Sequence, residues 1–566
     1  MPALQNFNLE LNRGEMLAIV GESGSGKSVM ALAIMRLLST SARVDQGSIL
    51  FSFDGREAVD LLRLNEKDFR SYRGSRISMI FQEPMTSMNP MMTCGAQVLE
   101  PLMLHKKIKV IPGRQAVLEL FRKVQLPDPE QIYRRYPHQL SGGQKQRVMI
   151  AMAISCDPAV LICDEPTTAL DVRIQKTILD LLRDLRHSEN IGMILITHDL
   201  GLVADMADRA MVMLKGRLME YGPVKSLFTL PKHPYTRGLL YCRPALHPKG
   251  ERLPLVSDFL NGNNQTSLSE FSGPVIPSIK EQVFISFSGK ETRKPVVKES
   301  DILIRVKNLG FRYSTLKTWL GKRKNGVDAI RNISFDVYNG ETLGLVGESG
   351  CGKTTLGRAL LGLNNPYRGS VSYNGVELHS MVKAELLDFR RNIQMVFQDP
   401  YSSLNPRMMI GPAIEEPLKV HGTMTRSERK ERVVEWLGKV DLKPEHFNRY
   451  PYAFSGGQRQ RIVIARALAL EPGFVVFDES VSALDVSVQA QVLNLINDLK
   501  EKLGFTVVFI SHDLSVVRWL CDRVIVMEKG EIVETGDTED VYLNPKTSYT
   551  RSLIEAIPGY NLTEKY

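Results

Sequence analysis

The chain has 566 residues, of which 43% are hydrophobic and 24% charged, so it can form several domains with ordinary globular cores. It contains no apolar run near the roughly 18 residues of a membrane-spanning helix. We expect a strand at its first alternating segment, Phe7–Leu11, with no signal peptide before it. The net charge of +9 is modest for this length and is typical of a solvated surface, with weak attraction to an anionic membrane face as the alternative.

The cysteines argue against a metal or disulfide framework. Six are scattered along the chain without a Cys-x-x-Cys pair, at Cys94, Cys156, Cys163, Cys242, Cys351 and Cys521. This spacing predicts neither a zinc site nor a disulfide scaffold and fits a reducing cytosol.

A buried strand, Leu17–Val20, leads into a glycine-rich octapeptide, and the same pattern returns after Thr342–Val346. Glycines let backbone N–H groups curl around phosphate oxygens, and the N-terminus of the following helix adds its positive dipole end. We expect the two lysines to reach the β- and γ-phosphates of a bound nucleotide and the last hydroxyl of each loop to bind Mg²⁺. The loops are Gly21-Glu22-Ser23-Gly24-Ser25-Gly26-Lys27-Ser28 and Gly347-Glu348-Ser349-Gly350-Cys351-Gly352-Lys353-Thr354.

The next apolar strand of each half ends at a glutamine. These residues stand in Ile80-Phe81-Gln82-Glu83-Pro84 and Val396-Phe397-Gln398-Asp399-Pro400. A glutamine at a strand end can contact Mg²⁺ or the attacking water while the loop behind it moves. We therefore assign Gln82 and Gln398 to the metal and catalytic sets.

A Ser-Gly-Gly-Gln sequence follows in each half and opens an expected helix, at Gln146–Ile154 and Gln460–Leu468. Ser-Gly-Gly at a helix N-terminus exposes N–H groups, so each half has a second predicted anion site. One nucleotide in a compact domain does not need two phosphate sites. We therefore predict an intramolecular dimer in which each half completes the other's phosphate-binding loop, through Ser141, Gly142 and Gly143 or through Ser455, Gly456 and Gly457.

Two more strand ends carry acids and a histidine. Val160–Glu165 and Phe474–Glu479 each end in an Asp-Glu pair, and apolar strands later in each half end at His198 or His512. The aspartates, Asp164 and Asp478, are predicted to face the metal ion, and Glu165 and Glu479 to polarise the attacking water. The equivalent placement of the two histidines favours contact with the γ-phosphate.

The repeat sets the domain boundaries. Ala3–Gly21 aligns with Ala329–Gly347 without a gap, and the later motifs align at a second constant offset. Residues 253–300 are rich in Ser, Asn, Gly, Pro and Lys and are predicted to form a linker between domains at 1–252 and 301–566. The second half opens with Ile302–Val306 and Phe311–Tyr313, which have no counterpart in the first, so we expect a missed upstream start or a first domain without its edge strand.

Taken together and in this order, the motifs resemble a fused pair of ABC-type ATPase domains. Their glutamine loops, and the sequences His233-Pro234-Tyr235-Thr236-Arg237 and Tyr549-Thr550-Arg551, resemble the peptide, nickel and glutathione importer branch. The resemblance implies an α/β fold of two tandem P-loop NTPase domains, each a RecA-like, mostly parallel sheet with an antiparallel β subdomain and a helical subdomain.

The resemblance also implies a transport function. It predicts an ATPase that energises import, with peptides as the favoured cargo and nickel or glutathione behind them. The expected partners are two transmembrane permease subunits and, through them, a substrate-binding protein, with no nucleic acid. The expected location is peripheral, on the cytoplasmic face of the inner membrane.

The sequence also leaves two alternative functions open. A soluble twin ATPase acting on ribosomes or DNA is the main alternative to the importer, and an exporter motor is a third possibility.

Tyr313 matches a family aromatic that stacks on adenine, with no counterpart in the first half. Cys242 is isolated, so we expect no iron–sulfur cluster. We interpret Cys351 as a loop filler rather than a reactive thiol, and the basic stretch Lys317–Lys324 as a solvated insertion rather than a membrane or partner contact.

Overall fold

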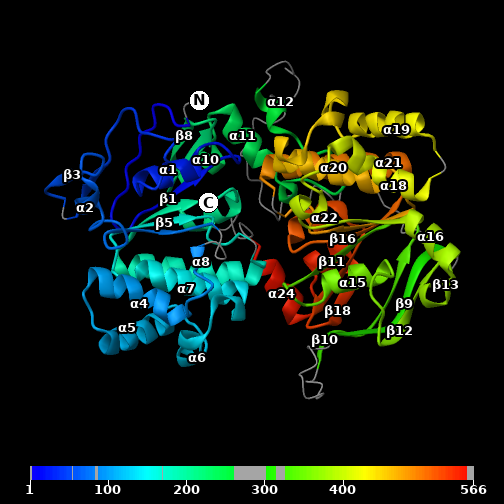
Figure 1. Ribbon diagram of the computed structural model, residues 1–566, viewed down its shortest axis with the longest axis horizontal. Coiled ribbons are helices and arrows are strands. Elements are labelled where there is room, and N and C mark those ends of the chain that lie inside the picture. Colours follow the sequence, from blue (N-terminus) through cyan, green and yellow to red (C-terminus); the bar gives the residue numbers. More distant parts are fainter. Residues whose placement is uncertain are drawn as a thin grey trace. The chain divides into compact units, whose positions relative to one another are not determined.

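The computed structural model describes residues 3–53, 55–82, 87–168, 170–260, 301–313, 326–422, 424–482 and 484–557 (Figure 1). Its described residues fall into two compact units. Unit 1 contains residues 3–240 and 256–260, and unit 2 contains residues 241–255 and 301–557.

Unit 1 is built on a six-stranded sheet with the strand order β4-β5-β6-β1-β7-β8. All neighbouring strands are parallel except β7 and β8, which are antiparallel. Strand β1 is buried along its whole length, because apolar side chains on both of its faces pack into cores. The strands are β1 (Met16–Val20), β4 (Ile77–Ile80), β5 (Val160–Asp164), β6 (Gly192–Ile196), β7 (Arg209–Leu214) and β8 (Arg217–Pro223).

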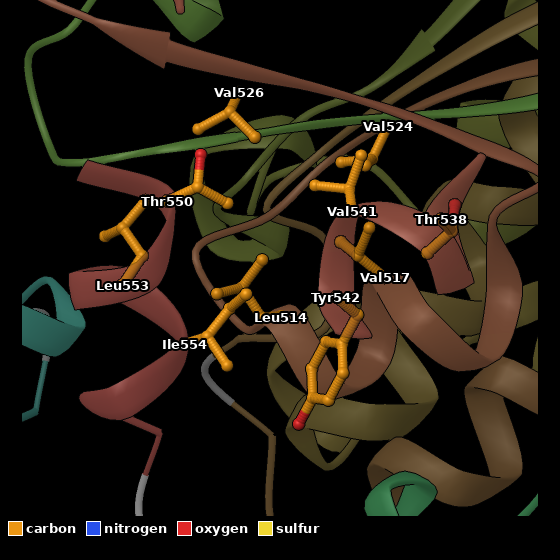
Figure 2. Close-up of a pocket in the computed structure, with 10 residues that line it drawn as sticks. All are labelled: Leu514, Val517, Val524, Val526, Thr538, Val541, Tyr542, Thr550, Leu553 and Ile554. Atoms are coloured by element: carbon orange, nitrogen blue, oxygen red, sulfur yellow. The ribbon is translucent and has the colours of Figure 1, made fainter. Parts of the chain in front are cut away.

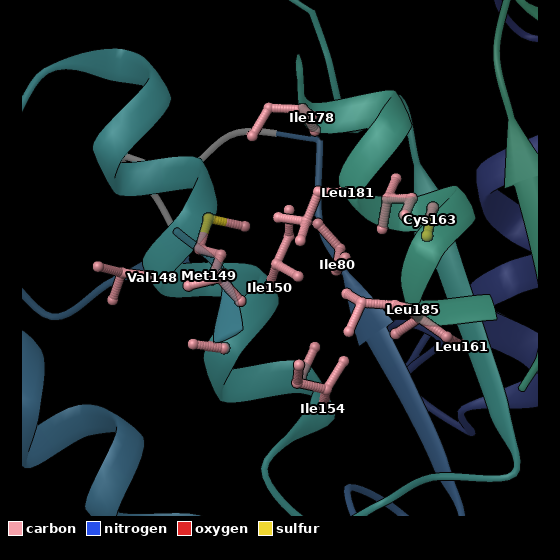
Figure 3. Close-up of a cluster of buried hydrophobic side chains, with 14 of the residues drawn as sticks. Ile80, Val148, Met149, Ile150, Ile154, Leu161, Cys163, Ile178, Leu181 and Leu185 are labelled. Atoms are coloured by element: carbon pink, nitrogen blue, oxygen red, sulfur yellow. The ribbon is translucent and has the colours of Figure 1, made fainter. Parts of the chain in front are cut away.

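The helices of unit 1 include a separate helical group, in which α4, α5 and α6 lie together beside α7 (Figure 1). The helix α7 buries Met149, Ile150 and Ile154 in a cluster with Ile80 of β4 and Leu181 of α8 (Figure 3). The helices are α1 (Lys27–Ile34), α2 (Glu66–Phe69), α4 (Cys94–His105), α5 (Val110–Lys123), α6 (Pro129–Arg134), α7 (Gly142–Ile154), α8 (Val172–Glu189), α9 (Leu200–Met206), α10 (Val224–Thr229), α11 (Pro234–Tyr241) and α12 (Val256–Leu260).

The antiparallel part of unit 1 is small. Among its described residues it consists of β2 (Leu50–Ser52) paired with β3 (Ala58–Asp60). The strand expected at Phe7–Leu11 was wrong, because this segment has no regular secondary structure. In unit 2 the aligned segment is a strand that pairs along its length with β9, whereas no described strand of unit 1 pairs with Phe7–Leu11. A strand needs a partner for its N–H and C=O groups, which explains the difference.

Unit 2 repeats the main sheet with the order β14-β15-β16-β11-β17-β18, again parallel except for β17 and β18. Its antiparallel sheet is larger than that of unit 1 and has the order β10-β9-β12-β13. The strands are β9 (Ile302–Tyr313), β10 (Val327–Tyr338), β11 (Thr342–Gly347), β12 (Arg368–Tyr373), β13 (Val376–Glu377), β14 (Ile393–Val396), β15 (Phe474–Asp478), β16 (Thr506–Ile510), β17 (Arg523–Glu528) and β18 (Glu531–Asp537).

The helices of unit 2 follow the same plan, with α18 packed against α19 and α20. They are α15 (Lys353–Leu360), α16 (Lys383–Asn392), α17 (Pro400–Ser403), α18 (Ile410–His421), α19 (Arg426–Lys439), α20 (Gly456–Leu468), α21 (Val486–Leu503), α22 (Leu514–Leu520), α23 (Thr538–Leu543) and α24 (Ser548–Glu555).

Residues 241–255 come from the first half of the sequence but pack within unit 2. Asn494 of α21 accepts a hydrogen bond from the Leu253 N–H at 3.0 Å and donates one to the Leu253 carbonyl at 2.8 Å. The Trp519 indole of α22 donates to the Glu251 carbonyl at 3.0 Å. We call residues 249–253 the docked segment.

The expected α/β fold is confirmed, with a mostly parallel sheet, an antiparallel part and a helical group in each unit. The strands predicted before the phosphate-binding loops, at the Asp-Glu pairs and before the histidines are all present. No helix in the described part of the chain combines the length and apolar character that a membrane span requires. The basic stretch 317–324 lies outside the described residues.

Candidate nucleotide-binding sites

The predicted site residues of unit 1 gather at one edge of the main sheet. The phosphate-binding loop follows β1, Gln82 follows β4, Asp164 ends β5 and His198 follows β6. These four strands are parallel neighbours, so their carboxyl ends meet at the same edge, where α/β sheets bind ligands. The loop after β11, Gln398, Asp478 and His512 repeat this arrangement in unit 2.

Each phosphate-binding loop turns into its helix through a glycine with a left-handed backbone. Gly26 has a φ of 101° and Gly352 a φ of 108°. A Cβ at these positions would also lie 2.9 Å from the carbonyl oxygen of Ala3 or 2.4 Å from that of Ala329, so only glycine fits. The helices α1 and α15 therefore begin directly after the loops, at Lys27 and Lys353.

The two loop lysines are buried and rest on loop carbonyls. Lys27 Nζ donates to the carbonyl of Gly21 at 2.6 Å and to that of Glu22 at 2.9 Å. Lys353 Nζ makes the same two contacts in unit 2, at 2.7 and 2.9 Å. The loop backbone thus fixes each ammonium group where a phosphate-binding cation is expected.

The hydroxyl that ends each loop contacts the strand-end aspartate. Thr354 Oγ1 donates to Asp478 Oδ1 at 3.1 Å, and Ser28 stands at the equivalent position of the first loop, where it acts to lower the pKa of Asp164. Burial raises the pKa of both aspartates, and the neighbouring glutamates add to the rise. Among the described residues, the buried Oδ1 atom of Asp164 has no hydrogen-bond partner. A buried, unpaired carboxylate oxygen beside a hydroxyl suits a hard cation such as Mg²⁺.

Glu165 is the centre of a hydrogen-bonded cluster in unit 1. Its Oε2 accepts from Gln82 Nε2 at 3.0 Å and from Thr168 Oγ1 at 2.8 Å, while Oε1 lies 3.2 Å from His198 Nδ1. Burial raises the pKa of this carboxyl, but hydrogen bonds from His198 and Thr168 and the charges of His198 and Lys27 outweigh burial and lower it to about 2. The group is therefore a carboxylate throughout the neutral range.

Unit 2 carries a similar cluster with one difference. Gln398 Nε2 donates to Glu479 Oε2 at 2.7 Å, and His512 Nδ1 lies 3.5 Å from the same oxygen. Ser482, the counterpart of Thr168, donates to the backbone carbonyl of Glu479 rather than to its carboxylate. The pKa of Glu479 is raised by burial and lowered more strongly by His512 and Lys353, so the net shift is downward.

Both glutamates have a left-handed backbone, with φ of 47° at Glu165 and 44° at Glu479. This conformation costs a non-glycine residue roughly 1–2 kcal/mol. It is held by a hydrogen bond from the Glu165 N–H to the Ile196 carbonyl of β6 at 2.9 Å, and from the Glu479 N–H to the Ile510 carbonyl of β16 at 2.9 Å. The chain turns sharply at the strand end, next to the histidine that the glutamate contacts.

The Ser-Gly-Gly-Gln sequences form capping boxes at the starts of α7 and α20. Ser141 Oγ accepts from the Gln144 N–H at 3.3 Å, and Gln144 Oε1 accepts from the Ser141 N–H at 3.1 Å. Ser455 and Gln458 repeat this pattern with the same distances. The predicted helices therefore begin at the glycines, earlier than Gln146 and Gln460.

The two glycines of each Ser-Gly-Gly sequence differ in their surroundings. A Cβ on Gly143 would lie 2.7 Å from Ile174 Cγ2, and a Cβ on Gly457 would lie 2.2 Å from Val488 Cγ1. The nearest such atom to Gly456 is Leu484 Cδ2 at 4.0 Å. The second glycine is therefore required for packing against α8 or α21, whereas packing within unit 2 does not require the first.

Tyr313 and Cys351, which were also singled out from the sequence, both lie next to the phosphate-binding loop of unit 2 or within it. Tyr313 ends β9, is half exposed, and its hydroxyl lies 3.1 Å from Thr355 Oγ1 at the start of α15. Cys351 is buried within its loop, and burial raises the pKa of its thiol. The raised pKa agrees with the interpretation of Cys351 as a loop filler. Stacking of an adenine on Tyr313 stays a prediction.

Three contacts with the site were missed from the sequence. Tyr235 and Tyr549 each accept a hydrogen bond from a backbone N–H of a phosphate-binding loop, and Thr168 contacts Glu165. The tyrosines lie far along the chain from the loops. The only signal was that a Tyr-Thr-Arg sequence occurs at equivalent positions in both halves.

Family models match both units. The model described as "ABC transporter" matches residues 4–168 and 330–482, and "Oligopeptide/dipeptide transporter, C-terminal region" matches residues 219–267 and 533–565. The chain therefore belongs to the ABC transporter family, and it carries two ATP-binding domains, each followed by this C-terminal region. Members of this class hydrolyse ATP, and the protein is an ATPase.

Curated relatives extend the match to almost the whole chain. "Glutathione import ATP-binding protein GsiA" of Pectobacterium atrosepticum is 45% identical over 558 residues, which are 98% of this chain and 86% of the relative. The protein of the same name from Escherichia coli strain K12 is 46% identical over 562 residues with the same coverage. The ATP-binding cassette MJ0796, solved as a dimer with ADP and Pi, matches 42% of this chain and 99% of its own length, with 30% identity and a TM-score of 0.38.

Proposed function

We propose that this protein is the energising subunit of an importer for glutathione or short peptides. Two features support the cargo class: relatives named for glutathione import align over 98% of the chain, and both halves carry the oligopeptide/dipeptide transporter C-terminal region. Glutathione is itself a small peptide, so both names describe one kind of cargo. Import of peptides in general was the expectation from the sequence, and the relatives favour glutathione within it.

The proposed ATP sites each use residues of both units. The first ATP binds residues 21–28 and is completed by Ser455, Gly456 and Gly457. The second binds residues 347–354, with Tyr313 on its base, and is completed by Ser141, Gly142 and Gly143. Gly456 supports this proposal: among the described residues of unit 2 the nearest atom to a Cβ built there is Leu484 Cδ2 at 4.0 Å, so packing does not require a glycine, whereas close approach of a phosphate would.

Mg²⁺ is proposed to bind the hydroxyl and carboxylate at each loop end. The ligands are Ser28, Asp164 and Gln82 in one site and Thr354, Asp478 and Gln398 in the other. The hydrogen bond from Thr354 to Asp478 and the unpaired oxygen of Asp164 support this assignment. The cation neutralises the charge on the β- and γ-phosphates.

The single observation that carries the catalytic proposal is the repeated cluster of glutamine, glutamate and histidine at the sheet edge. A glutamate kept ionised can accept a proton from the attacking water, so Glu165 and Glu479 act as general bases. His198 and His512 orient the glutamates and contact the γ-phosphate. Gln82 and Gln398 link the glutamates to the loops that follow β4 and β14.

We propose two transmembrane permease subunits as the partners, and a substrate-binding protein that reaches the ATPase only through them. The protein would then act at the cytoplasmic face of the inner membrane. Closure of the two ATP sites would pull on the permeases, and hydrolysis would release them. No nucleic acid takes part in this cycle.

Transport in reconstituted vesicles tests this function. The ATPase, copurified with its permease subunits, should drive ATP-dependent uptake of labelled glutathione or a dipeptide, and K27A/K353A should abolish uptake. ATPase activity that responds to ribosomes or DNA, with no binding to any permease, would contradict import and favour the soluble twin ATPase.

A further inference from the structure

Tyr235 and Tyr549 occupy equivalent places in the two C-terminal regions and have no part in the chemistry described above. They lie in the first turns of α11 and α24. Tyr235 is fully buried, and 7% of Tyr549 is exposed. A buried phenol usually has a hydrogen-bond partner, which makes the partner of its hydroxyl informative.

Each hydroxyl contacts the second residue of the phosphate-binding loop in its own unit. The Glu22 N–H donates to the Tyr235 hydroxyl over 3.2 Å, and the Glu348 N–H donates to the Tyr549 hydroxyl over 3.1 Å. The contact therefore occurs independently in both units. In each case a C-terminal region holds a loop more than two hundred residues earlier in the chain.

The same peptide group also supports the loop lysine. The N–H of Glu22 and the carbonyl of Gly21 belong to one planar peptide, whose carbonyl accepts from Lys27 Nζ at 2.6 Å. In unit 2 the peptide between Gly347 and Glu348 accepts from Lys353 Nζ at 2.7 Å. A rotation of this peptide would disturb both hydrogen bonds at once, and such chains of hydrogen bonds strengthen one another.

The helix that carries each tyrosine is firmly seated. In unit 2, Thr550, Leu553 and Ile554 of α24 line an apolar pocket opposite Leu514 of α22 and Val526 of β17 (Figure 2). Equivalent residues line a pocket in unit 1, where Thr236, Leu239 and Leu240 of α11 face β1, β7, α9 and α10. The apolar contacts fix the helix, and the helix fixes the tyrosine.

A glutamate on the last strand of each main sheet anchors the start of the same helix. Glu220 of β8 accepts from the N–H groups of Lys232 and His233, at 2.8 and 3.1 Å. Glu534 of β18 accepts from the N–H groups of Lys546 and Thr547, at 2.9 and 3.2 Å. These contacts hold the loop just before each tyrosine.

We propose that Tyr235 and Tyr549 are positioning residues for ATP binding, through which the C-terminal regions hold the first peptide of each phosphate-binding loop in the orientation that supports the lysine. This inference rests on the proposed function, in which the lysines bind ATP phosphates. Loss of a hydroxyl leaves a loop N–H without its acceptor, so the peptide turns away and the lysine loses its support. ATP binding weakens, whereas the glutamate, histidine and glutamine that act in hydrolysis keep their places.

The test compares Y235F/Y549F with the control Y221F in the full-length chain. Tyr221 also lies in the first C-terminal region, but it is partly exposed on β8 and stacks with Arg209 through its ring, which phenylalanine retains. We expect the KM for ATP to rise about 5- to 150-fold in Y235F/Y549F, the range for an unsatisfied buried donor, with kcat changed less than about 3-fold. Y221F should keep both parameters.

A second pair of substitutions, in the loops, tests whether the tyrosines act through the loop N–H groups or through the stability of the fold. E22P/E348P removes the two N–H groups that need an acceptor, so adding Y235F/Y549F there should change the KM less than about 2-fold. A rise in KM of the same size in this background, or a Y235F/Y549F chain that binds ATP as Y221F does, would overturn the positioning role.

The lysine variant distinguishes failure of this inference from failure of the proposed function. K27A/K353A should lose ATP binding whatever the tyrosines do. Undiminished ATP binding by K27A/K353A would refute the proposed sites themselves, and with them the positioning role.

Discussion

At the scale of single residues, the two clusters around Glu165 and Glu479 carry the proposed hydrolysis. Each brings one glutamine and one histidine onto a carboxylate that is held in a left-handed turn. The clusters are not identical, because Thr168 contacts the Glu165 carboxylate and Ser482 contacts only the Glu479 backbone. The Glu165 carboxylate therefore accepts a hydrogen bond from the hydroxyl at this position, and the Glu479 carboxylate does not.

Replacement of either glutamate tests its role as general base. We expect E165Q or E479Q to slow hydrolysis about 10²- to 10⁴-fold at its own site, because glutamine cannot accept the proton from water. Single-turnover assays on chains with one intact lysine, K27A or K353A, would measure each site separately. Unchanged turnover in E165Q/E479Q would refute the assignment.

The ion pair of His512 with Glu479 gives stability a defined pH dependence. Burial lowers the pKa of His512, but the hydrogen bond and charge of Glu479 outweigh it, so the net shift is upward. A raised folded pKa stabilises the protein fully below the ordinary value of about 6.5, and this contribution is lost as pH rises through the folded pKa.

We therefore expect the unfolding midpoint of H512Q to lie below that of the unchanged chain at pH 6, with a gap that narrows toward alkaline pH. One proton limits the slope to about 1.4 kcal/mol per pH unit. Calorimetry between pH 5.5 and 9 measures the gap, and the E479Q background should remove its pH dependence. A gap that widens with pH would contradict the ion pair.

Most residues of the two sites could be predicted from the sequence because they sit in short repeated motifs at strand ends. The lysines, Asp164, Glu165 and His198 gather as expected, since parallel neighbouring strands bring their carboxyl ends together. Tyr235 could not be assigned, because its contact with Glu22 depends on how α11 packs. No spacing along the chain encodes that packing.

At the scale of secondary structure, the close approach of α20 to α21 depends on one glycine. A Cβ at Gly457 would lie 2.2 Å from Val488 Cγ1, which leaves no room for it. The nearest such atom to a Cβ at Gly456 is Leu484 Cδ2 at 4.0 Å, which leaves room. We expect G457A to destabilise unit 2 by about 1–3 kcal/mol through overpacking, and V488A to restore part of that loss in the double variant.

Gly456→Ala is the matched comparison for this prediction. It should leave the unfolding midpoint nearly unchanged but lower ATP turnover at the Lys27 site, where the proposed function places Gly456. Thermal unfolding and single-site turnover measure the two effects. Equal destabilisation by G456A and G457A would contradict the packing account.

Attachment of the docked segment to α21 depends on Asn494. Asn494 satisfies both backbone groups of Leu253, and both residues are buried. Arg252 and Lys249 add ion pairs to Asp498 and Asp522. Asn494→Asp places a carboxylate oxygen against the Leu253 carbonyl, so we expect a loss of about 2–4 kcal/mol from burial of an unpaired acceptor.

Hydrogen exchange at the Leu253 amide measures this loss directly, and the unfolding midpoint measures its effect on the unit. Asn497→Ala, on the same helix but with a side chain that donates to Glu501 and not to Leu253, should leave the Leu253 amide protected. Full protection in N494D would show that Asn494 does not hold the segment.

Elements could be predicted where their own sequence suffices and not where they need a partner. The buried apolar strands of both main sheets were found from their composition. Phe7–Leu11 alternates like a strand, yet the long strand β9, which pairs with its counterpart in unit 2, has no equivalent in the described part of unit 1. Whether this segment forms a strand therefore depends on a pairing partner and not on its alternating sequence.

At the scale of the whole molecule, the account depends on the duplication of one ATPase unit within a single chain. Each unit holds its own phosphate-binding loop, Asp-Glu pair, histidine and Ser-Gly-Gly sequence. The proposed function requires that the Ser-Gly-Gly sequence of each unit serves the ATP of the other. A linked pair keeps the effective concentration of the partner unit high at all times.

Vanadate trapping tests this requirement most directly. Vanadate replaces the γ-phosphate after hydrolysis, and ultraviolet light then cuts the backbone at the residues that touch it. In K353A only the Lys27 site can trap vanadate, and we predict cuts within residues 21–28 and at Ser455. Cuts at Ser141 in place of Ser455 would show that each unit completes its own site, and would contradict the account.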